Sequence, residues 1–408
     1  MGDPKKSRFS GISSQFEVSP KEEPAMIGTR RNKLFIGIPK DGSNLDKRVP
    51  LTPSAVSVLV NNGHRVLIES KAGEASRFKD TDFSEAGAEI TLDRKQVYEA
   101  EIILKVSPPP MEEVKMMRPN QVLISPLQLS TVKTEYIQEL IKRKVTAIAF
   151  EYVKDDSGAF PFVRSMSEIA GSTSILIASE YLSHEHHGKG ILLGGISGVA
   201  PSKVVILGAG VVGEYAARTA LGLGATVKIF DNNIYKLMRL QNNIGLRLFT
   251  SIFDPDVLEM ELVTADVAIG AIHAEAGRTP VIVTEDMVSK MRPGSVIVDV
   301  SIDQGGCFET SEVTTFKKPT YTKFDVIHYC IPNIPSRVSR TASYAISNIL
   351  SPLLLKCSQY GSMDKLLHQS LPERNGTYVY KGCLTNEHIG ERFGLKYMDL
   401  NLLFTAEM

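Results

Sequence analysis

Three glycines at fixed spacing follow an apolar segment near the middle of the chain. The run Lys203–Leu207 has the composition of a buried strand, and Gly208, Gly210 and Gly213 come directly after it. The first glycine permits a tight turn, the second lets backbone approach a pyrophosphate, and the third lets a helix pack closely on the strand. The N–H groups at the start of that helix attract phosphate. The pattern predicts a dinucleotide site rather than a purely structural glycine-rich turn.

An acidic residue ends the next apolar strand, Thr226–Asp231. Asp231 can accept hydrogen bonds from both hydroxyls of an adenosine ribose, and its charge repels a 2′-phosphate. The predicted cofactor is therefore NAD rather than NADP. Lys236, five residues further on, is a candidate to contact the same ribose, although a solvated helix lysine explains it nearly as well.

The composition is that of a globular protein without a specialised partner. The chain has 408 residues, is 43% hydrophobic, and carries 46 basic and 46 acidic side chains. The length suffices for two domains, the balanced charge argues against nucleic acid or a membrane surface as partner, and no apolar run approaches the ~18 residues of a membrane span. The four cysteines lack CxxC spacing, so we expect reduced thiols in a cytoplasmic protein and no metal site. The clustered His184, His186 and His187 are interpreted as cations near a helix end.

Strand and helix patterns alternate from Lys33 onwards, which predicts parallel sheets with helices on both faces. We predict a substrate domain that begins with residues 33–165 and an NAD-binding domain over residues 166–335. A C-terminal segment, residues 336–408, is expected to return to the first domain through its long apolar helix. Residues 1–32 are polar, and we interpret them as a flexible extension or an interface arm.

Seven segments together resemble the alanine dehydrogenase family, which is related to the NAD-binding domain of proton-pumping transhydrogenase. They are Gly37–Lys40, Lys47–Pro53, Ala72–Ala75, Ile103–Val106, Met166–Gly171, Asp299–Glu309 and Pro332–Ser336. The resemblance covers nearly everything from Lys33 to about Pro352. It implies two Rossmann-like, doubly wound parallel-sheet domains with the active site in the cleft between them. It also implies a homo-oligomer, commonly a hexamer.

The reaction that this resemblance implies is the reversible oxidative deamination of L-alanine to pyruvate and ammonia, with hydride passing to NAD. A small amino acid presents a carboxylate, so cations must lie where it binds. Arg48 precedes a predicted helix start, and its planar fork suits two-point carboxylate binding. Lys105 ends an apolar strand, and strand ends in open α/β sheets face the ligand crevice. A solvated surface lysine is the alternative for Lys105, and the resemblance favours substrate binding by both residues.

Asp303 follows the apolar strand Val296–Val300 and precedes two glycines. A carboxylate at this position can activate the attacking water or stabilise a cationic imine, whereas a turn-forming aspartate is the alternative.

Ser167 is expected at the cleft and as the N-cap of a helix running towards His187. The family usually has methionine where Ile334 stands. We expect NAD to contact Ser167, Gly208, Gly210, Val211, Val212, Gly213, Asp231, Lys236, Ile272, Asn333 and Ile334.

The chain departs from the family at a position that matters for catalysis. A family histidine serves as general acid/base on the loop after the strand that matches Gln121–Ile124, and Gln128 occupies its place. An amide can orient a carbonyl or hold water, but it cannot shuttle a proton near neutral pH. Asp303 and water can carry the protons instead. His273, just past a predicted strand, is a weaker substitute, because loop histidines are usually only solvated.

Three functions are compatible with these residues. The first is an NAD-dependent L-alanine dehydrogenase in which Asp303 helps water hydrolyse the imine and Gln128 positions the carbonyl or the water. The second is a non-catalytic NAD(H)-binding protein of the transhydrogenase type, since those relatives tend to have glutamine near this position. The third is a dehydrogenase for another small amino or keto acid, with a pocket reshaped by Gln128. The glycine motif does not separate them, because all three need it.

Overall fold

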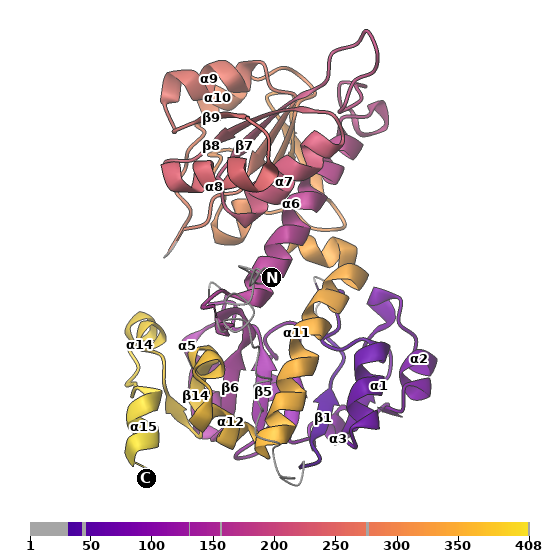
Figure 1. Cartoon of the computed structure of the whole chain (residues 1–408), viewed down its shortest axis with the longest axis vertical. Coiled ribbons are helices and arrows are strands. Elements are labelled where there is room, and N and C mark those ends of the chain that lie inside the picture. Colours follow the sequence, from indigo (N-terminus) through magenta and orange to yellow (C-terminus); the bar gives the residue numbers. More distant parts are fainter. Residues whose placement is uncertain (1–31, 43–45, 130, 156, 275–276, 407–408) are drawn as a thin grey trace, which may run out of the picture.

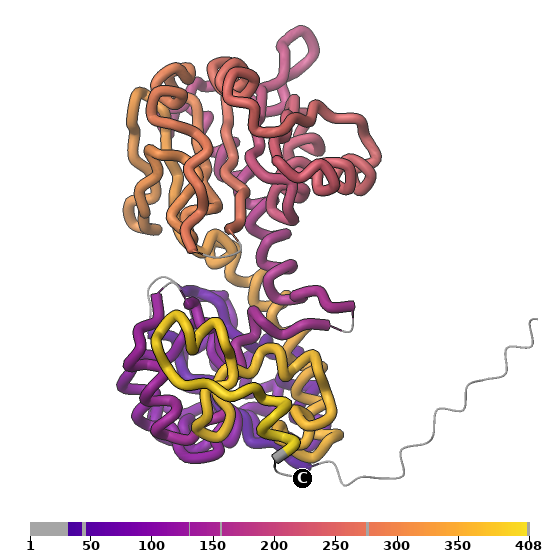
Figure 2. The backbone as a smooth tube through the Cα atoms, turned by 90° about the vertical axis from the view of Figure 1, so that its left-hand side faces the viewer, coloured from indigo at the N-terminus to yellow at the C-terminus, as the bar shows by residue number. Residues whose placement is uncertain are grey.

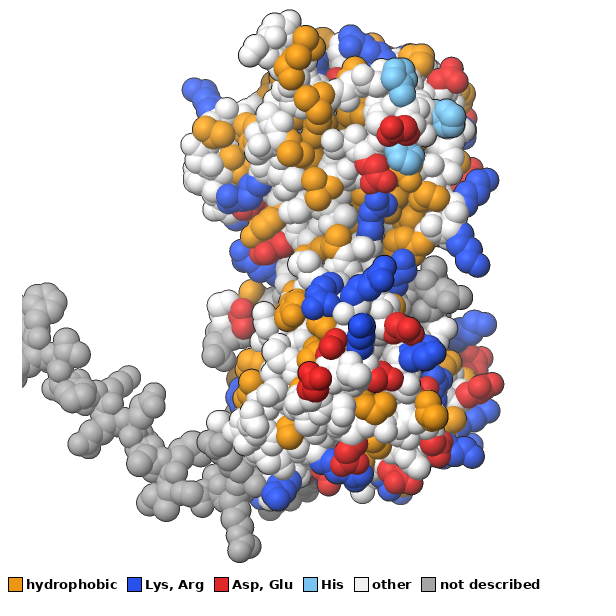
Figure 3. Space-filling view, turned by 90° about the vertical axis from the view of Figure 1, so that its right-hand side faces the viewer, with side chains coloured by type: hydrophobic (Ala, Val, Ile, Leu, Met, Phe, Trp, Pro, Cys, Tyr) orange, Lys and Arg blue, Asp and Glu red, His pale blue; other side chains and the backbone are white. Residues whose placement is uncertain are grey.

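Two α/β domains are stacked along the long axis of the molecule, with a narrower waist between them (Figures 1, 2 and 3). The structure, a computed structural model, describes residues 32–42, 46–129, 131–155, 157–274 and 277–406. The predicted N-terminal extension therefore lies outside the described residues, except for Asn32. Helices α6 (Pro161–Tyr181) and α11 (Ser339–Tyr360) connect the domains and pack against each other (Figure 1).

The first domain contains an eight-stranded sheet with the order β15-β14-β6-β5-β4-β1-β2-β3. Its strands are β1 Phe35–Ile38, β2 Arg65–Glu69, β3 Glu89–Thr91, β4 Ile102–Leu104, β5 Val122–Ser125, β6 Thr146–Ala149, β14 Thr377–Tyr380 and β15 Cys383–Leu384. The six strands from β6 to β3 are parallel, whereas β14 and β15 pair antiparallel at one edge. The parallel part has the doubly wound strand order 3-2-1-4-5-6.

The second domain repeats this order in a seven-stranded sheet, β12-β13-β11-β10-β7-β8-β9. Its strands are β7 Lys203–Leu207, β8 Thr226–Phe230, β9 Phe249–Ser251, β10 Val267–Gly270, β11 Val296–Asp299, β12 Thr320–Lys323 and β13 Val326–Tyr329. Six strands are parallel, and β12 pairs antiparallel with β13. The prediction of two doubly wound parallel sheets is confirmed, but the antiparallel edge strands were not predicted.

Helices cover both faces of each sheet, which explains why central strands such as β4 and β10 are apolar throughout rather than alternating. In β7, Val204 and Ile206 join the core on one face, while Val205 and Leu207 join the core on the other. The remaining α-helices are α1 Pro53–Asn61, α2 Asp80–Glu85, α3 Arg94–Val97, α4 Met111–Val114, α5 Thr134–Lys142, α7 Val211–Gly222, α8 Ile234–Ile244, α9 Pro255–Val263, α10 Glu285–Ser289, α12 Met363–Gln369, α13 Leu371–Gly376, α14 Glu387–Phe393 and α15 Leu400–Ala406.

The start of α6 corrects one sequence-based prediction. Ser167 was expected to be the N-cap, but it lies inside the helix, which begins at Pro161 with Phe160 at the N-cap. Proline is favoured at the first helical position because its fixed φ suits the helix and its missing N–H is not needed there. The predicted C-terminal helix is present as α11, and its Ile346, Leu350 and Leu354 enter the core of the first domain.

A buried histidine in the second sheet makes stability depend on pH. The ring of His328 is fully buried, with Nε2 bonded to the Thr310 hydroxyl at 2.8 Å and Nδ1 to the Val326 carbonyl at 2.9 Å. Burial lowers the pKa of His328 to about 4. The unfolded chain, with an ordinary pKa of about 6.5, binds that proton more readily, so the native state loses up to ~3 kcal/mol as pH falls from about 6.5 to about 4.

Acid unfolding followed by circular dichroism measures this loss. The His328→Gln variant is expected to lack the part of the pH dependence that lies between about 6.5 and 4. The matched control is His388→Gln, since His388 is an exposed histidine in α14. Identical pH dependence of wild type and His328→Gln would contradict the prediction.

Candidate active site

The glycine loop has the geometry that a pyrophosphate needs. Gly208 has φ +111°, and a Cβ there would lie 2.4 Å from the carbonyl oxygen of Ala271. A Cβ at Gly213 would lie 1.9 Å from the carbonyl oxygen of Gly208, so both positions require glycine. Gly210 is the N-cap of α7 and has open space where a Cβ would stand. The N–H groups at the start of α7 are thus accessible to a phosphate.

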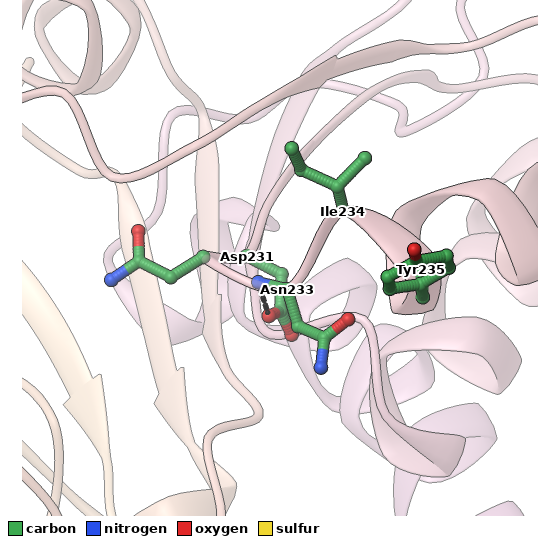
Figure 4. A pocket seen from close by; sticks show the side chains of 5 residues that line it. Asp231, Asn233, Ile234 and Tyr235 are labelled. Atoms are coloured by element: carbon green, nitrogen blue, oxygen red, sulfur yellow. Dashed lines mark hydrogen bonds between the residues drawn. The ribbon is translucent and has the colours of Figure 1, made fainter.

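Asp231 follows β8 beside this loop. Its carboxylate accepts the N–H of Ala209 at 2.7 Å and that of Asn233 at 2.7 Å, which ties the glycine loop to the start of α8. An open pocket lies next to it, lined by residues 231–235, with the Ile234 and Tyr235 side chains largely exposed (Figure 4). Lys236 is exposed on α8. This arrangement fits the adenosine half of a dinucleotide.

Replacing Asp231 by asparagine tests this assignment. The variant keeps one oxygen acceptor but loses the charge that repels a 2′-phosphate. Hydrogen bonds to charged groups contribute about 1.5–3 kcal/mol, so we expect NADH to bind roughly 10- to 100-fold more weakly and the preference over NADPH to shrink. Fluorescence titration measures both affinities. Asp286→Asn, at an exposed position of α10, is the control, and unchanged NADH affinity in Asp231→Asn would contradict the assignment.

Arg48 lies at the junction of the two domains in a buried ion pair. Its Nε donates to Asp46 Oδ1 at 2.8 Å and its Nη2 donates to Asp46 Oδ2, while its Nη1 lies 3.3 Å from the Met166 sulfur. Asn333, from the second domain, donates its side-chain amide to Asp46 Oδ2 at 3.1 Å. Burial by itself lowers the pKa of Arg48, but Asp46 and other nearby carboxylates raise it overall. Arg48 is therefore a fixed cation.

Asp303 lies close to this group. It belongs to the short 3₁₀ helix η5 (Val300–Gln304), and its Oδ1 accepts the backbone N–H of Asn333 at 3.0 Å. The residue is exposed, but the protein packed around its carboxyl partly removes it from water, and this desolvation raises the pKa of the carboxyl against the opposing effects of the Asn333 N–H and the Arg48 charge. A carboxylate with a raised pKa beside a cation can exchange a proton with water.

A second aspartate holds the loop that carries Asp303. Asp299 is fully buried and accepts the N–H of Ser301 at 3.0 Å, the N–H of Cys307 at 2.9 Å and the Ser311 hydroxyl at 2.7 Å. A Cβ at Gly306, which has φ +81°, would lie 2.7 Å from Asp299 Oδ2. The close packing of the Asp299 carboxylate thus explains why Gly306 is a glycine.

Lys105 and Gln128 lie in two further polar clusters. Lys105 is buried after β4, and its Nζ contacts Glu113 at 2.7 Å; Glu113 also accepts from Arg94 and from the Tyr98 hydroxyl. Both predicted carboxylate-binding cations are therefore already paired with a carboxylate. Such pairs fix the position of the cation more than they add stability.

Gln128 is exposed and has the left-handed φ of +50°. The backbone N–H groups of Leu127 and Gln128 donate to Glu151 Oε1 at 2.7 and 3.2 Å, so this carboxylate fixes the loop. Burial raises the pKa of Glu151, and the backbone N–H groups oppose that rise. The Gln128 side chain itself contributes an amide that can orient a ligand.

Two family models match the chain. The N-terminal domain model of alanine dehydrogenase/PNT matches residues 37–170, and the C-terminal domain model matches residues 174–387. Alanine dehydrogenase 2 of Staphylococcus aureus (strain USA300) is 40% identical over 365 residues, which are 89% of this chain and 98% of that protein. The chain belongs to the alanine dehydrogenase/PNT family.

Solved structures agree with this membership. An L-alanine dehydrogenase structure aligns with a TM-score of 0.83 and 38% identity, covering 88% of this chain and 99% of that chain. A transhydrogenase from Sinorhizobium meliloti aligns with a TM-score of 0.73 and 23% identity, covering 86% of this chain and 99% of that chain. The second likeness shows the fold alone.

In this member of the alanine dehydrogenase/PNT family, the other predicted cofactor residues follow the carboxyl ends of strands β7, β10 and β13 or lie on α6. Val211 and Val212 begin α7. The N–H of Ile272, after β10, donates to the Ser301 hydroxyl at 2.9 Å. Ile334 is buried in the 3₁₀ helix η6 (Ile334–Val338), and Ser167 lies in α6 one residue after the Met166 that touches Arg48. His273 is exposed.

Sequence reasoning missed the carboxylates that position the predicted residues: Asp46, Glu113, Glu151 and Asp299. Among the described residues, no group of three or more His, Cys, Asp or Glu side chains is placed to hold a metal ion. The part of the chain that the structure describes also contains no helix that is both long and apolar enough to span a membrane. The ring of His186, one of the clustered histidines, contacts that of Tyr181 at a tilt of 45°, with centroids 4.6 Å apart, and its Nε2 lies 3.8 Å from a Glu180 carboxylate oxygen.

Proposed function

We propose that this protein catalyses the NAD-dependent oxidative deamination of L-alanine to pyruvate and ammonia, and the reverse reductive amination. The observation that carries the proposal is the meeting of Arg48, Asn333 and Asp303 between the two domains. A cation for the substrate carboxylate and a carboxylate able to move protons thus stand beside the domain that carries the glycine loop. The names of the relatives support alanine as the substrate.

NAD, when bound, supplies the acceptor for the hydride that leaves the substrate Cα. The glycine loop and Asp231 are the residues that fit its pyrophosphate and adenosine ribose. Asn333, whose backbone N–H donates to Asp303, and the buried Ile334 next to it in the chain are our candidates for the nicotinamide side. The open space at Gly210 is the observation that supports this fit, because a side chain there would cover the start of α7.

The substrate carboxylate would bind Arg48, with Lys105 as a second cation. Asp303 would remove a proton from the water that attacks Cα of the imine, since one of its oxygens is engaged by Asn333 and the other can take the proton. The exposed amide of Gln128 would orient the carbonyl oxygen or that water. The Gln128 amide cannot deliver a proton, so Asp303 and water carry the protons in this proposal.

The assay is NADH oxidation by the purified protein with pyruvate and ammonium, with glyoxylate and 2-oxobutyrate in parallel and ammonium omitted as control. We expect ammonium-dependent turnover that is highest with pyruvate. Faster turnover of another keto acid would support a dehydrogenase with a reshaped pocket. NADH binding without any turnover would refute the proposal.

That last outcome corresponds to the second candidate, an NAD(H)-binding protein without amino-acid chemistry. Gln128 is the observation that favours it, because its amide does not titrate. The pairing of Arg48 with Asp46 and of Lys105 with Glu113 also reduces the net positive charge offered to a carboxylate. Asp303 has no evident role in such a protein, and for that reason we place catalysis first.

We further propose a cytoplasmic homo-oligomer, and a hexamer is the assembly that the family resemblance implies. The four cysteines are free thiols, three of them buried, which suits a reducing compartment. Light scattering after size-exclusion chromatography measures the assembly. A monomer at micromolar concentration would contradict this proposal.

A further inference from the structure

Asp46 is a buried carboxylate at the junction of the domains, and the proposed function gives it no role. It is 7% exposed, and its carboxylate accepts hydrogen bonds from Nε and Nη2 of Arg48 and from the side-chain amide of Asn333. The first two contacts come from its own domain and the third comes from the other domain. Asp46 therefore joins a predicted substrate residue to a predicted cofactor residue.

The backbone around Asp46 is held by a row of buried serine hydroxyls. The N–H of Lys47 donates to Ser336 Oγ at 2.9 Å, that of Val49 to Ser343 Oγ at 2.9 Å, and that of Thr52 to Ser347 Oγ at 3.1 Å. These serines belong to η6 and α11. Because these bonds hold the main chain, we expect the backbone of this segment to keep its conformation when the Asp46 charge is removed.

The contacts form a continuous chain between the two halves of the site. Arg48 donates to Asp46, Asn333 donates its side chain to Asp46, and the backbone N–H of Asn333 donates to Asp303. Asn333 has the left-handed φ of +59°, a conformation that asparagine tolerates better than most residues, and it lets one residue bond both carboxylates. A movement of Asn333 would thus shift the Asp46 carboxylate, and with it the Arg48 side chain.

Asp46 also decides which edge of Arg48 is offered to a ligand. The edge formed by Nε and Nη2 is engaged by Asp46. Nη1 faces the Met166 sulfur at 3.3 Å, and a thioether is a weak acceptor that a carboxylate can replace. A substrate carboxylate would thus approach Arg48 from the Nη1 side.

We propose that Asp46 is a positioning residue that orients Arg48 for the substrate carboxylate and couples that orientation to Asn333 on the cofactor side. This inference rests on the proposed function, since it assigns the substrate to Arg48. It predicts that the affinity for the keto acid depends on Asp46. It also predicts that cofactor binding in the second domain slows hydrogen exchange in the segment 46–52 of the first.

The kinetic test compares Asp46→Asn, Asp46→Glu and the control Glu74→Gln, whose carboxylate is exposed in the same domain. For Asp46→Asn we expect KM for pyruvate to rise at least roughly tenfold, with KM for NADH changed by less than about threefold, because a charged hydrogen-bond acceptor of Arg48 is lost. Asp46→Glu is expected to recover part of the loss, and Glu74→Gln to match wild type. An unchanged KM for pyruvate, or an equal rise in both KM values, would overturn the proposal.

A double-mutant cycle with Asn333→Ala tests the coupling. If Asp46 and Asn333 act through each other, the effects of the two substitutions on KM for pyruvate are less than multiplicative when combined. Fully multiplicative effects would show that they act independently and would overturn the coupling. Circular dichroism melting of each variant identifies any that is misfolded.

A second measurement does not depend on turnover. Hydrogen exchange of the peptide that contains residues 46–52 is compared with and without NADH, in wild type and in Asp46→Asn. We expect NADH to slow this exchange in wild type and not in the variant, with equal NADH affinity in both. If wild type fails to turn over pyruvate but shows this difference, the proposed function fails and the coupling stands. If NADH slows the exchange equally in both proteins, the coupling is refuted.

Discussion

Asp303→Asn is expected to lower kcat for alanine oxidation roughly 10²- to 10⁴-fold, the usual contribution of a positioned proton-transfer group. The amide keeps the shape of the carboxylate and can still accept the backbone N–H of Asn333, which now donates at 3.0 Å. It cannot take a proton from water. Steady-state kinetics with alanine and NAD at several pH values measures the effect, and NADH affinity is expected to stay within about threefold of wild type.

The pH profile of the wild type adds a check on the same residue. The surrounding protein raises the pKa of the Asp303 carboxyl. The reactive form is the carboxylate, so kcat is expected to fall as pH drops through this raised pKa, at a higher pH than an ordinary aspartate would give. The Asp303→Asn variant should lack this acid limb. If Asp303→Asn has the same kcat as the wild type and the same decrease of kcat at low pH, Asp303 takes no part in the mechanism.

The glycine loop could be predicted from the sequence because most of its constraints are local; only Gly208 is also restricted from a distance, by the Ala271 carbonyl after β10. Gly208, Gly213 and Asp231 lie within one strand–helix–strand unit, and the contacts that explain Gly213 and Asp231 are made inside it. The Asp46–Asn333 bond, in contrast, joins residues 287 positions apart. It exists only because α11 returns to the first domain and brings η6 beside the segment that contains Arg48.

Buried carboxylates were missed for a physical reason. An acidic residue in a polar stretch is normally exposed, so the default interpretation of Asp46 or Glu113 is a solvated charge. Their burial becomes tolerable only through partners on other elements, such as Arg48 for Asp46 and Lys105 for Glu113. Sequence reasoning found those two cations but could not find the carboxylates that hold them.

A local sequence pattern marks the turn between the two C-terminal strands. The residues between β14 and β15 are Lys381 and Gly382, with φ of +47° and +88°. Positive φ at both central residues is the requirement of the tight turn that suits a hairpin. The apolar and aromatic run Thr377–Tyr380 before such a turn predicts a strand. Its pairing with β6, far away in sequence, is a tertiary contact that no local pattern specifies.

Gln128→His is the substitution expected to raise activity most. Histidine tolerates the left-handed backbone that Gln128 adopts, at φ +50°, better than most residues do. The loop is held by backbone N–H bonds to Glu151, which the substitution leaves in place. The new imidazole would add a group that titrates near pH 6.5 at the position where the family has its acid/base histidine. We expect a gain in kcat of roughly 10²-fold or more, with an ionisation near neutral pH that the wild type lacks.

The matched control for this gain is Gln128→Asn, which keeps an amide, suits the same backbone conformation and cannot titrate. It is expected to show no increase in kcat. If histidine and asparagine have the same effect, proton transfer at this position does not limit the reaction. Asp303 and water would then already supply the protons, and Gln128 would not reduce the activity of the wild type. If only histidine accelerates turnover, the cleft retains the geometry for acid/base chemistry at position 128, and the wild-type rate is limited by the amide.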